Sequence, residues 1–275
     1  MNNLVSSSAP QISFLDKLKN FIIKNLKYII VLLIIIIILC ITFLTSYYFR
    51  NLNTVSEMNN NYNKLIIDQT NFCSENLNKY RVCDFYINSS SNIGLVGNQQ
   101  FDYLSLDIIP QIIKAGVKYF EIEIFNETQN NDTNPVVSSG YKQGDWKLTN
   151  YIPLDIFLKK ILENGFSEKL INNYQDPIFI YLNIKVNDNN KTLEKIYNIV
   201  NNTCGQRLLP HSYNYQGINI ATNSVCNLIN KIVLMANKSY TEHKLGRIIN
   251  CSLENVYLQR VGFSKLLNPV SRDED

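Results

Sequence analysis

Histidine and closely spaced cysteine pairs are what this sequence most lacks. The 275 residues include only two histidines, His211 and His243, and none of the six cysteines lies in a Cys-x-x-Cys pair. Structural zinc sites are usually built from such residues at short spacing, so the sequence argues against one. The chain also has no internal repeat, and its net charge of +3 is too small and too dispersed to predict binding of nucleic acid.

The commonest residue types point to a source rather than to a fold. Asparagine, isoleucine, lysine and tyrosine are frequent, which is the mixture that AT-rich codons give. A large DNA virus or an AT-rich protist is therefore the expected source. A viral source would make a virion membrane protein one of the hypotheses.

One long hydrophobic run lies near the start of the chain. From Tyr28 to Phe49 about 22 residues carry no charge, and at about 1.5 Å per residue they span roughly 33 Å, enough to cross the hydrocarbon core of a bilayer. The run has no polar face, which a buried core helix would show. It also lacks the shorter apolar region and the small-residue cleavage site of a signal peptide. We therefore expect a single transmembrane helix.

Lysines set the expected orientation of this helix. The positive-inside rule places the lysine-rich side in the cytosol, so residues 51–275 are expected on the lumenal or extracellular side, or on a virion membrane. Phe14–Leu26 combines apolar residues at helical spacing with several lysines, and it would either lie along an anionic membrane face or extend the membrane helix. Arg50 alone follows the run closely, whereas four lysines precede it: Lys17, Lys19, Lys24 and Lys27.

An exported domain can form disulfides and carry glycans. The cysteines after the run are odd in number, so at least one stays free or pairs elsewhere. They are Cys73, Cys83, Cys204, Cys226 and Cys251. Because asparagine is common, chance alone gives about four or five Asn-x-Ser/Thr triplets, and the glycosylation signal is weak. The triplets begin at Asn88, Asn126, Asn131, Asn190, Asn201, Asn237 and Asn250.

Beyond the hydrophobic run, strand and helix patterns alternate. This alternation predicts an α/β architecture with a parallel sheet, either open or closed into a barrel. The expected strands are Phe85–Asn88, Val117–Phe125, Ile178–Ile184 and Ile232–Ala236, with a brief extended piece at Pro135–Ser139. The expected helices are Lys64–Tyr80, Tyr103–Lys114, Leu154–Glu163 and Thr192–Asn201.

Two carboxylates share one face of the strand Val117–Phe125. Glu121 and Glu123 are two positions apart, so their side chains point the same way. Like charges this close repel unless a cation or a proton lies between them. The plain alternative is an edge strand with both acids in solvent. Polar residues also follow neighbouring strands, at Ile87–Asn92 and Tyr181–Asn183, where α/β folds place their sites.

Four motifs, in order and properly spaced, resemble the X region of phosphatidylinositol-specific phospholipase C over about residues 83–240. DFYINSSSN (Asp84–Asn92) resembles the family's YFINSSHN, and AGVKYFEIEIF (Ala115–Phe125) resembles its AGCRCVELDCW. PVVSSGY (Pro135–Tyr141) resembles PVVYHGH, and DPIFIYLNI (Asp176–Ile184) resembles YPVILSLEN. The resemblance implies a TIM-type barrel that cleaves the phosphodiester of an inositol lipid. It also implies two histidines that transfer protons and a calcium ion held by Asn and carboxylates.

The chain departs from this pattern at the catalytic positions. The resemblance places the family's two catalytic histidines on Ser91 and Tyr141, and neither a hydroxyl nor a phenol with an ordinary pKa near 10 transfers protons at neutral pH as imidazole does. The substrate-binding lysines would fall near Met235 and Asn237, so these phosphate contacts are lost as well. The implied calcium ligands are Asn92 and Glu121, which are retained, Glu123 in place of Asp, and Asn183 in place of Glu.

The chain is also short for the implied fold. A full barrel needs about 250 residues, whereas fewer than 200 follow Asp84, with at most a fragment of the family's second half at His243–Lys265. We therefore expect a partial or reduced TIM-type barrel, whose open side is covered by Lys64–Tyr80, by the C-terminal tail or by a second subunit. The expected division is a cytosolic segment 1–27, a transmembrane helix 28–49, a tether and short helix 50–82, the phospholipase-like domain 83–265 and an acidic tail 266–275.

Three functional hypotheses follow. The first is a membrane-bound pseudoenzyme for binding or scaffolding, with the bilayer and an inositol-lipid head group as partners and calcium binding that is weak at most, since one ligand charge is lost. The second is an active phosphoric diester hydrolase with a rearranged site that uses His211 or His243. The third is a purely structural membrane protein, such as a viral envelope component.

Overall fold

The computed structural model describes residues 14–62, 79–96, 103–127, 134–143, 145–186, 190–214 and 218–252. The chain divides into two compact units, Met1–Leu52 and Asn53–Asp275. The expected helix Lys64–Tyr80, the end of the fragment His243–Lys265 and the acidic tail 266–275 lie wholly or largely outside the described residues.

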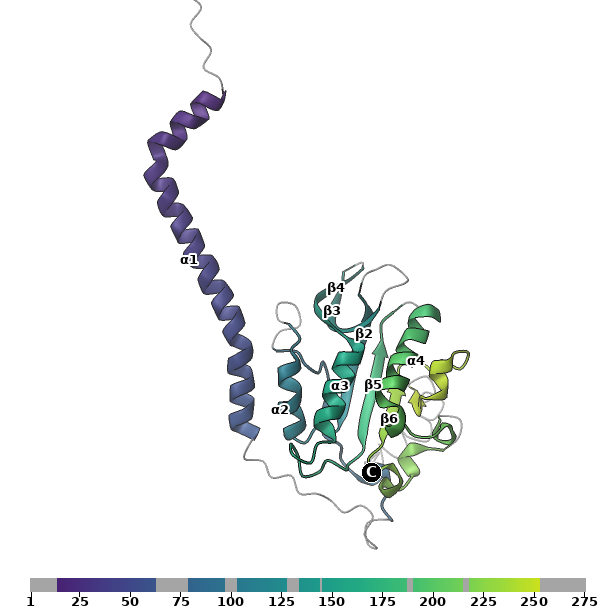
Figure 1. Ribbon diagram of the computed structural model, residues 1–275. Helices are drawn as coiled ribbons and strands as arrows, with labels where there is room; N and C mark the ends of the chain where they lie inside the picture. Colours follow the sequence, from purple (N-terminus) through teal and green to yellow (C-terminus); the bar gives the residue numbers. More distant parts are fainter. Residues whose placement is uncertain are drawn as a thin grey trace, which may run out of the picture. The chain divides into compact units, whose positions relative to one another are not determined.

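Helix α1 runs from Phe14 to Tyr62 and contains the hydrophobic run (Figure 1). Its most apolar window has a mean hydropathy of 3.2, so it is long and apolar enough to cross a membrane. The hydroxyl groups of Thr42 and Thr45 donate to the carbonyl oxygens of the preceding turn, at 2.9 Å in each case, and so satisfy their polarity within the helix. The helix continues through residues 51–62, which were expected to form a tether, because no proline or glycine interrupts it there.

A seven-stranded sheet forms the centre of the second unit within the described residues, in the order β4-β3-β2-β5-β6-β7, with β1 also paired to β2. Strands β1, β2, β5, β6 and β7 run parallel, whereas β3 and β4 form an antiparallel hairpin beside β2. The sheet is open, and no closed barrel is found among the residues described. The strands are β1 (Ser89–Ser90), β2 (Tyr119–Asn126), β3 (Pro135–Gln143), β4 (Asp145–Pro153), β5 (Ile178–Ile184), β6 (Ile232–Ala236) and β7 (Cys251–Ser252).

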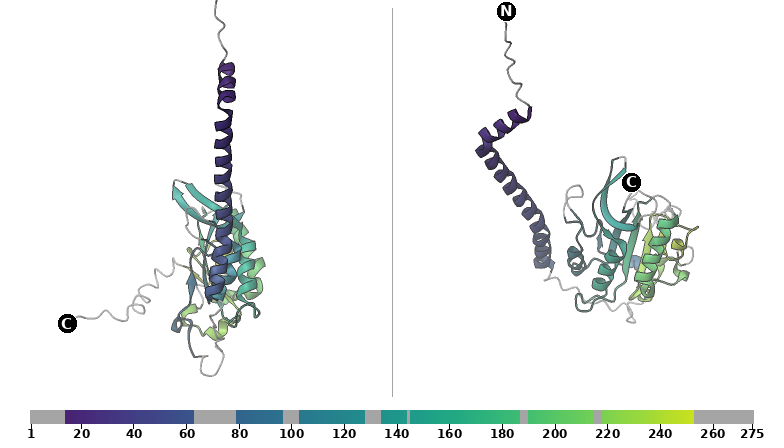
Figure 2. Two further views of the ribbon diagram at one scale, coloured as in Figure 1. Left: turned by 90° about the vertical axis from the view of Figure 1, so that its left-hand side faces the viewer. Right: turned by 45° about the horizontal axis from the view of Figure 1, so that its top comes forward.

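Three helices pack on one face of this sheet, as Figures 1 and 2 show: α2 (Ile109–Lys114), α3 (Leu154–Gly165) and α4 (Asn190–Cys204). Phe120 and Ile122 of β2 face them, and Phe157 of α3 is fully buried among the same side chains. Each such large side chain contributes about 1.5–3 kcal/mol by leaving water. Short 3₁₀ helices connect these elements: η1 (Val82–Asp84), η2 (Leu106–Ile108), η3 (Gly205–Arg207), η4 (His211–Tyr213), η5 (Ile220–Thr222), η6 (Val225–Leu228) and η7 (Lys244–Arg247).

The other face of the sheet is apolar near the start of the strands and polar near their carboxyl ends. Near the start of β5 and β6, Phe179 and Val233 belong to a second apolar cluster together with residues of η1, η5 and η6. Farther along β2 and β5, the same face carries Glu121, Glu123 and Asn183. The second cluster therefore closes one end of this face and leaves the carboxyl ends of the strands to polar groups.

The predicted strands Ile178–Ile184 and Ile232–Ala236 are confirmed residue for residue as β5 and β6. The predicted strand Val117–Phe125 is confirmed as β2, and Gly116, with a φ of +85°, ends the helix before it. The strand predicted at Phe85–Asn88 was misplaced, because pairing begins only at Ser89. The hairpin was not predicted: β3 extends well beyond the brief piece expected, and β4 was missed.

Candidate functional site

The site begins with a gap along one edge of β2. The start of β2 pairs with β1 at Tyr119 and Phe120, and its end pairs with β3 from Ile124 onward. Glu121–Glu123 lie between these two pairings on that edge. The chain turns away after β1 at Asn92, whose φ of +48° lies in the left-handed region that asparagine tolerates better than most residues. Two neighbouring strands therefore leave room beside the two glutamates.

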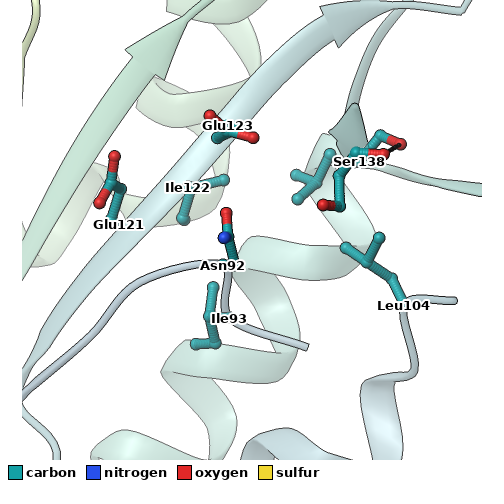
Figure 3. A pocket seen from close by; sticks show the side chains of 9 residues that line it. Asn92, Ile93, Leu104, Glu121, Ile122, Glu123 and Ser138 are labelled. Carbon is teal, nitrogen blue, oxygen red and sulfur yellow. Dashed lines mark hydrogen bonds between the residues drawn. The ribbon is translucent and has the colours of Figure 1, made fainter. Parts of the chain in front are cut away.

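A pocket occupies this gap. It is a narrow depression rather than an enclosed cavity: about 200 Å³ there is not filled by atoms, open solvent included. Figure 3 shows side chains of Asn92, Glu121, Glu123 and Ser138 reaching it from three separate segments of the chain. The lining residues are Asn92, Ile93, Leu104, Glu121, Ile122, Glu123, Val137, Ser138 and Ser139.

Glu121 is held by an amide of the next strand. The Asn183 Nδ2 group donates to Glu121 Oε1 at 3.0 Å. The register makes this contact possible, since β2 and β5 are parallel with Glu123 opposite Asn183. A neutral amide at this position satisfies one carboxylate oxygen without neutralising its charge.

Glu123 is held by a lysine that follows β5. The distance from Lys185 Nζ to Glu123 Oε1 is 3.8 Å, and the Glu123 side chain is 15% exposed. Glu123 Oε2 is buried and has no hydrogen-bond partner among the described residues. Burial raises the pKa of the Glu123 carboxyl, Lys185 opposes this shift, and the charge of Glu121 adds to it. Glu123 is thus the carboxyl at this site that burial moves toward its neutral form.

Two tyrosines lie beside the glutamates on the same face. Burial, with smaller contributions from Glu121 and Tyr119, raises the pKa of Tyr181 to about 12. Burial and the charges of Glu121 and Cys251 also raise the pKa of Tyr119. Both phenols therefore stay protonated near neutral pH, so they can donate hydrogen bonds but cannot serve as bases.

Ser139 is one of the pocket residues that the sequence did not indicate as a site residue. Its side chain is 2% exposed, and its hydroxyl has no hydrogen-bond partner among the described residues. The β3–β4 register shifts between Ser138 and Gly140, at Ser139 itself. The neighbouring Ser138 hydroxyl instead donates to the Asn150 carbonyl oxygen at 2.5 Å. The sequence did contain a sign of this residue. The family motif PVVYHGH has two histidines, and the first of them aligns with Ser139.

The two proposed positions of lost histidines have different surroundings. Ser91 is exposed, directly precedes Asn92, and is not among the residues that line the pocket. Tyr141 lies on β3 opposite Lys147 of β4, and its side chain is outside what the structure describes. The structure thus brings together Asn92, Glu121, Glu123 and Asn183, with Ser91 next to this group in the chain.

Neither histidine of the chain lines the pocket. His211 is exposed at the start of η4. His243 Nδ1 accepts a hydrogen bond of 3.1 Å from the Leu245 backbone N–H and so caps η7. Asn237 lies near the position implied for a substrate-binding lysine, but its side chain contacts the backbone. Its Oδ1 accepts from the Ile184 N–H at 3.3 Å, and its Nδ2 donates to the Ile184 carbonyl oxygen at 3.0 Å.

The arrangement does not fit a divalent cation as it stands. Calcium prefers six to eight oxygen ligands, whereas the Asn183 amide N–H points at Glu121 and the Lys185 ammonium lies beside Glu123. A divalent ion bound to both carboxylates would compete with the Lys185 ammonium, and Asn183 would have to turn its amide oxygen toward the ion. No group of three or more His, Cys, Asp or Glu side chains suited to a metal is found among the described residues.

Comparison with known proteins gives one match in sequence and several in structure. The profile of the family described as "Phosphatidylinositol-specific phospholipase C, X domain" matches residues 79–238. No curated protein sequence matches the chain.

The solved structures that resemble the chain are distant. L. pealei PLC21 has 17% identity and a TM-score of 0.47, over 58% of this chain and 19% of that one. S. officinalis PLC21 has 19% identity and a TM-score of 0.44, over 60% and 19% of the two chains. A calcium-dependent phosphoinositol-specific phospholipase C from Pseudomonas sp. has 11% identity and a TM-score of 0.44, over 67% and 70%. The chain thus corresponds to about a fifth of the length of the first two proteins.

Proposed function

The chain belongs to the phosphatidylinositol-specific phospholipase C X-domain family, and from this premise we propose that it is a membrane-anchored pseudoenzyme that binds its ligand without cleaving it. One observation carries the proposal: neither of the two histidines in the whole chain lines the pocket. The pocket offers carboxylates, an amide and hydroxyls instead.

Phosphodiester cleavage by this family's route needs a base for the attacking hydroxyl and an acid for the leaving oxygen. Each proton-transfer group contributes about 10²–10⁴ in rate, so loss of both leaves little activity. Tyr181, which lies beside the glutamates, does not supply the missing base either, since its pKa of about 12 keeps it protonated near neutral pH. The pocket residues that remain support binding rather than turnover.

Helix α1 supports the membrane part of the proposal, since it is long and apolar enough to span a bilayer. We propose that the lysines before the hydrophobic run remain in the cytosol and that the domain faces the lumen, the exterior or the outside of a virion membrane. Anchoring would hold the pocket at high local concentration near lipid head groups, of which an inositol lipid is the proposed ligand. The open sheet edge is the proposed contact for a second subunit.

A second candidate function is an active phosphoric diester hydrolase with a rearranged site. The observation in its favour is Glu123, a buried carboxyl with a raised pKa and one oxygen without a partner among the described residues. Raised carboxyl pKa values occur in general acids and bases. In this hypothesis Glu123 would transfer the proton, and Glu123→Gln would abolish turnover.

The test uses the full-length chain reconstituted in vesicles that contain phosphatidylinositol. We expect no release of inositol phosphate above that of empty vesicles, with or without calcium. A histidine-containing phospholipase C in the same vesicles is the positive control. Calorimetric titration of the detergent-solubilised chain with glycerophosphoinositol measures binding separately, and a binding heat that Asn92→Ala removes is expected. Turnover that Glu123→Gln abolishes would establish the second function instead.

A further inference from the structure

Each glutamate of the pocket faces a polar group from the segment that ends β5: Glu121 accepts a hydrogen bond, and Glu123 forms an ion pair. Asn183 donates to Glu121 at 3.0 Å, and the Lys185 ammonium lies 3.8 Å from Glu123. Asn183 and Lys185 are two positions apart, as the two glutamates are. The amide and the ammonium group therefore lie beside the two carboxylates across the parallel pair β2–β5.

The backbone holds Lys185 at this position. Its N–H donates to the Ile124 carbonyl oxygen at 2.8 Å, directly after Glu123 on the neighbouring strand. On the other side, the Asn237 side chain bonds both backbone groups of Ile184. Both neighbours thus fix the backbone from which the lysine side chain extends toward Glu123.

The ion pair lies in a partly buried place. The Lys185 side chain is 29% exposed and that of Glu123 is 15% exposed, whereas Lys244 and Glu194, an ion pair on the surface, are 59% and 51% exposed. Charges that are shielded from water interact more strongly than exposed ones and are screened less by salt. The Lys185–Glu123 pair should therefore affect stability more than the Lys244–Glu194 pair does.

We propose that Lys185 is the built-in cation of this pocket and makes the domain independent of divalent ions. The inference rests on the proposed function, which identifies this pocket as the binding site. It adds that Lys185 balances the negative charge of the pocket. The ammonium group lies 3.8 Å from Glu123 Oε1, and its charge repels a cation that approaches this carboxylate. A ligand of the pocket would then meet a carboxylate whose charge the neighbouring lysine already balances.

Thermal unfolding of the full-length chain, followed by scanning calorimetry in detergent, tests this inference. Wild type should have the same midpoint in EDTA and in millimolar calcium. Lys185→Met should lower the midpoint in EDTA by about 3 °C or more, and calcium should recover most of that loss, because two adjacent carboxylates then lack a cation. Lys185→Arg keeps the positive charge, so its unfolding midpoint should not change when calcium is added.

Lys244→Met is the matched control, since it removes a lysine from an exposed ion pair of 3.2 Å. It should change the midpoint little and create no calcium response. A wild-type midpoint that rises with calcium would overturn the inference, and so would Lys185→Met responding to calcium no more than wild type does. If Lys185→Met does not fold, Lys185→Gln takes its place, and its midpoint is compared with that of wild type in EDTA and in calcium. The same two results would overturn the inference. The turnover assay is independent, because a calcium-stabilised chain can still lack activity.

Discussion

The ammonium group of Lys118 donates a hydrogen bond of 2.7 Å to the carbonyl oxygen of Asn173, in the loop that follows α3. It also donates to the Gly165 carbonyl oxygen at 3.4 Å, at the end of that helix. Lys118 is 7% exposed. A buried lysine thus connects the entry to β2 with the loop after α3, and it also bonds the last carbonyl group of that helix.

Stability should depend on pH through this lysine. Burial lowers the pKa of Lys118 to about 8, against an opposing effect of Asp176, whereas the unfolded chain keeps a value near 10.4. Between these values the unfolded state binds more protons, so the free energy of unfolding rises with pH, by at most about 1.4 kcal/mol per pH unit. Urea unfolding of wild type and Lys118→Met from pH 7 to about 10 measures the difference. The wild-type curve should rise relative to the variant, and parallel curves would contradict the assignment.

Asn183 should stabilise the domain through Glu121. Asn183→Leu keeps the approximate size of the side chain and removes the amide that donates to Glu121 Oε1. Loss of a hydrogen bond to a charged group costs about 1.5–3 kcal/mol. Denaturant unfolding should show a loss of this size, whereas Asn198→Leu on the exposed face of α4 should change stability by less than about 0.5 kcal/mol. Equal losses in both variants would mean that the Glu121 contact contributes nothing.

The two serines at the end of the pocket should respond oppositely to alanine. Ser139 buries a hydroxyl without a partner among the described residues, whereas the Ser138 hydroxyl donates to the Asn150 carbonyl oxygen. Ser139→Ala should therefore leave stability unchanged or raise it by up to about 1 kcal/mol, and Ser138→Ala should lower it by about 1 kcal/mol. Unfolding curves of the pair provide the comparison. A clear loss in Ser139→Ala would show that its hydroxyl has a partner.

Glycosylation would report which side of the membrane the domain occupies. Asn190 and Asn201 are exposed on α4, and eleven residues place them on nearly the same face of the helix. Asn250, by contrast, is 4% exposed, and its amide donates to the Tyr213 carbonyl oxygen. A lumenal domain should carry glycans at Asn190 and Asn201 and none at Asn250.

Expression in cells with a secretory pathway, followed by glycosidase treatment, measures this directly. Asn190→Gln and Asn201→Gln should each remove one glycan from the mass of the full-length chain, and Asn250→Gln should remove none. A chain without any glycan would reverse the proposed orientation. In the described part of the chain Cys226 is disulfide-bonded, which agrees with an oxidising compartment.

The central strands were predictable because they are buried on both faces. Ile178–Ile184 and Ile232–Ala236 are continuous apolar runs, and burial on both sides is what such runs indicate. Strand β4 has no such signal, since Asp145, Lys147 and Asn150 interrupt it, and its partner is the adjacent β3. Its strand conformation depends on that pairing rather than on local preference.

The candidate site was predictable only in part, for a related reason. Alternation along β2 was enough to place Glu121 and Glu123 on one face. Lys185 follows its strand in sequence, and only the β2–β5 register shows that it reaches Glu123. Ser139 lines the pocket at a register irregularity of the hairpin, which composition does not reveal.

The most direct test of the account is the release of inositol phosphate from phosphatidylinositol vesicles that contain the full-length chain. The account predicts no release above background in EDTA or in calcium, because neither histidine of the chain lines the pocket. Sustained release that Glu121→Gln or Glu123→Gln abolishes would contradict it and show that the cleavage depends on this pocket.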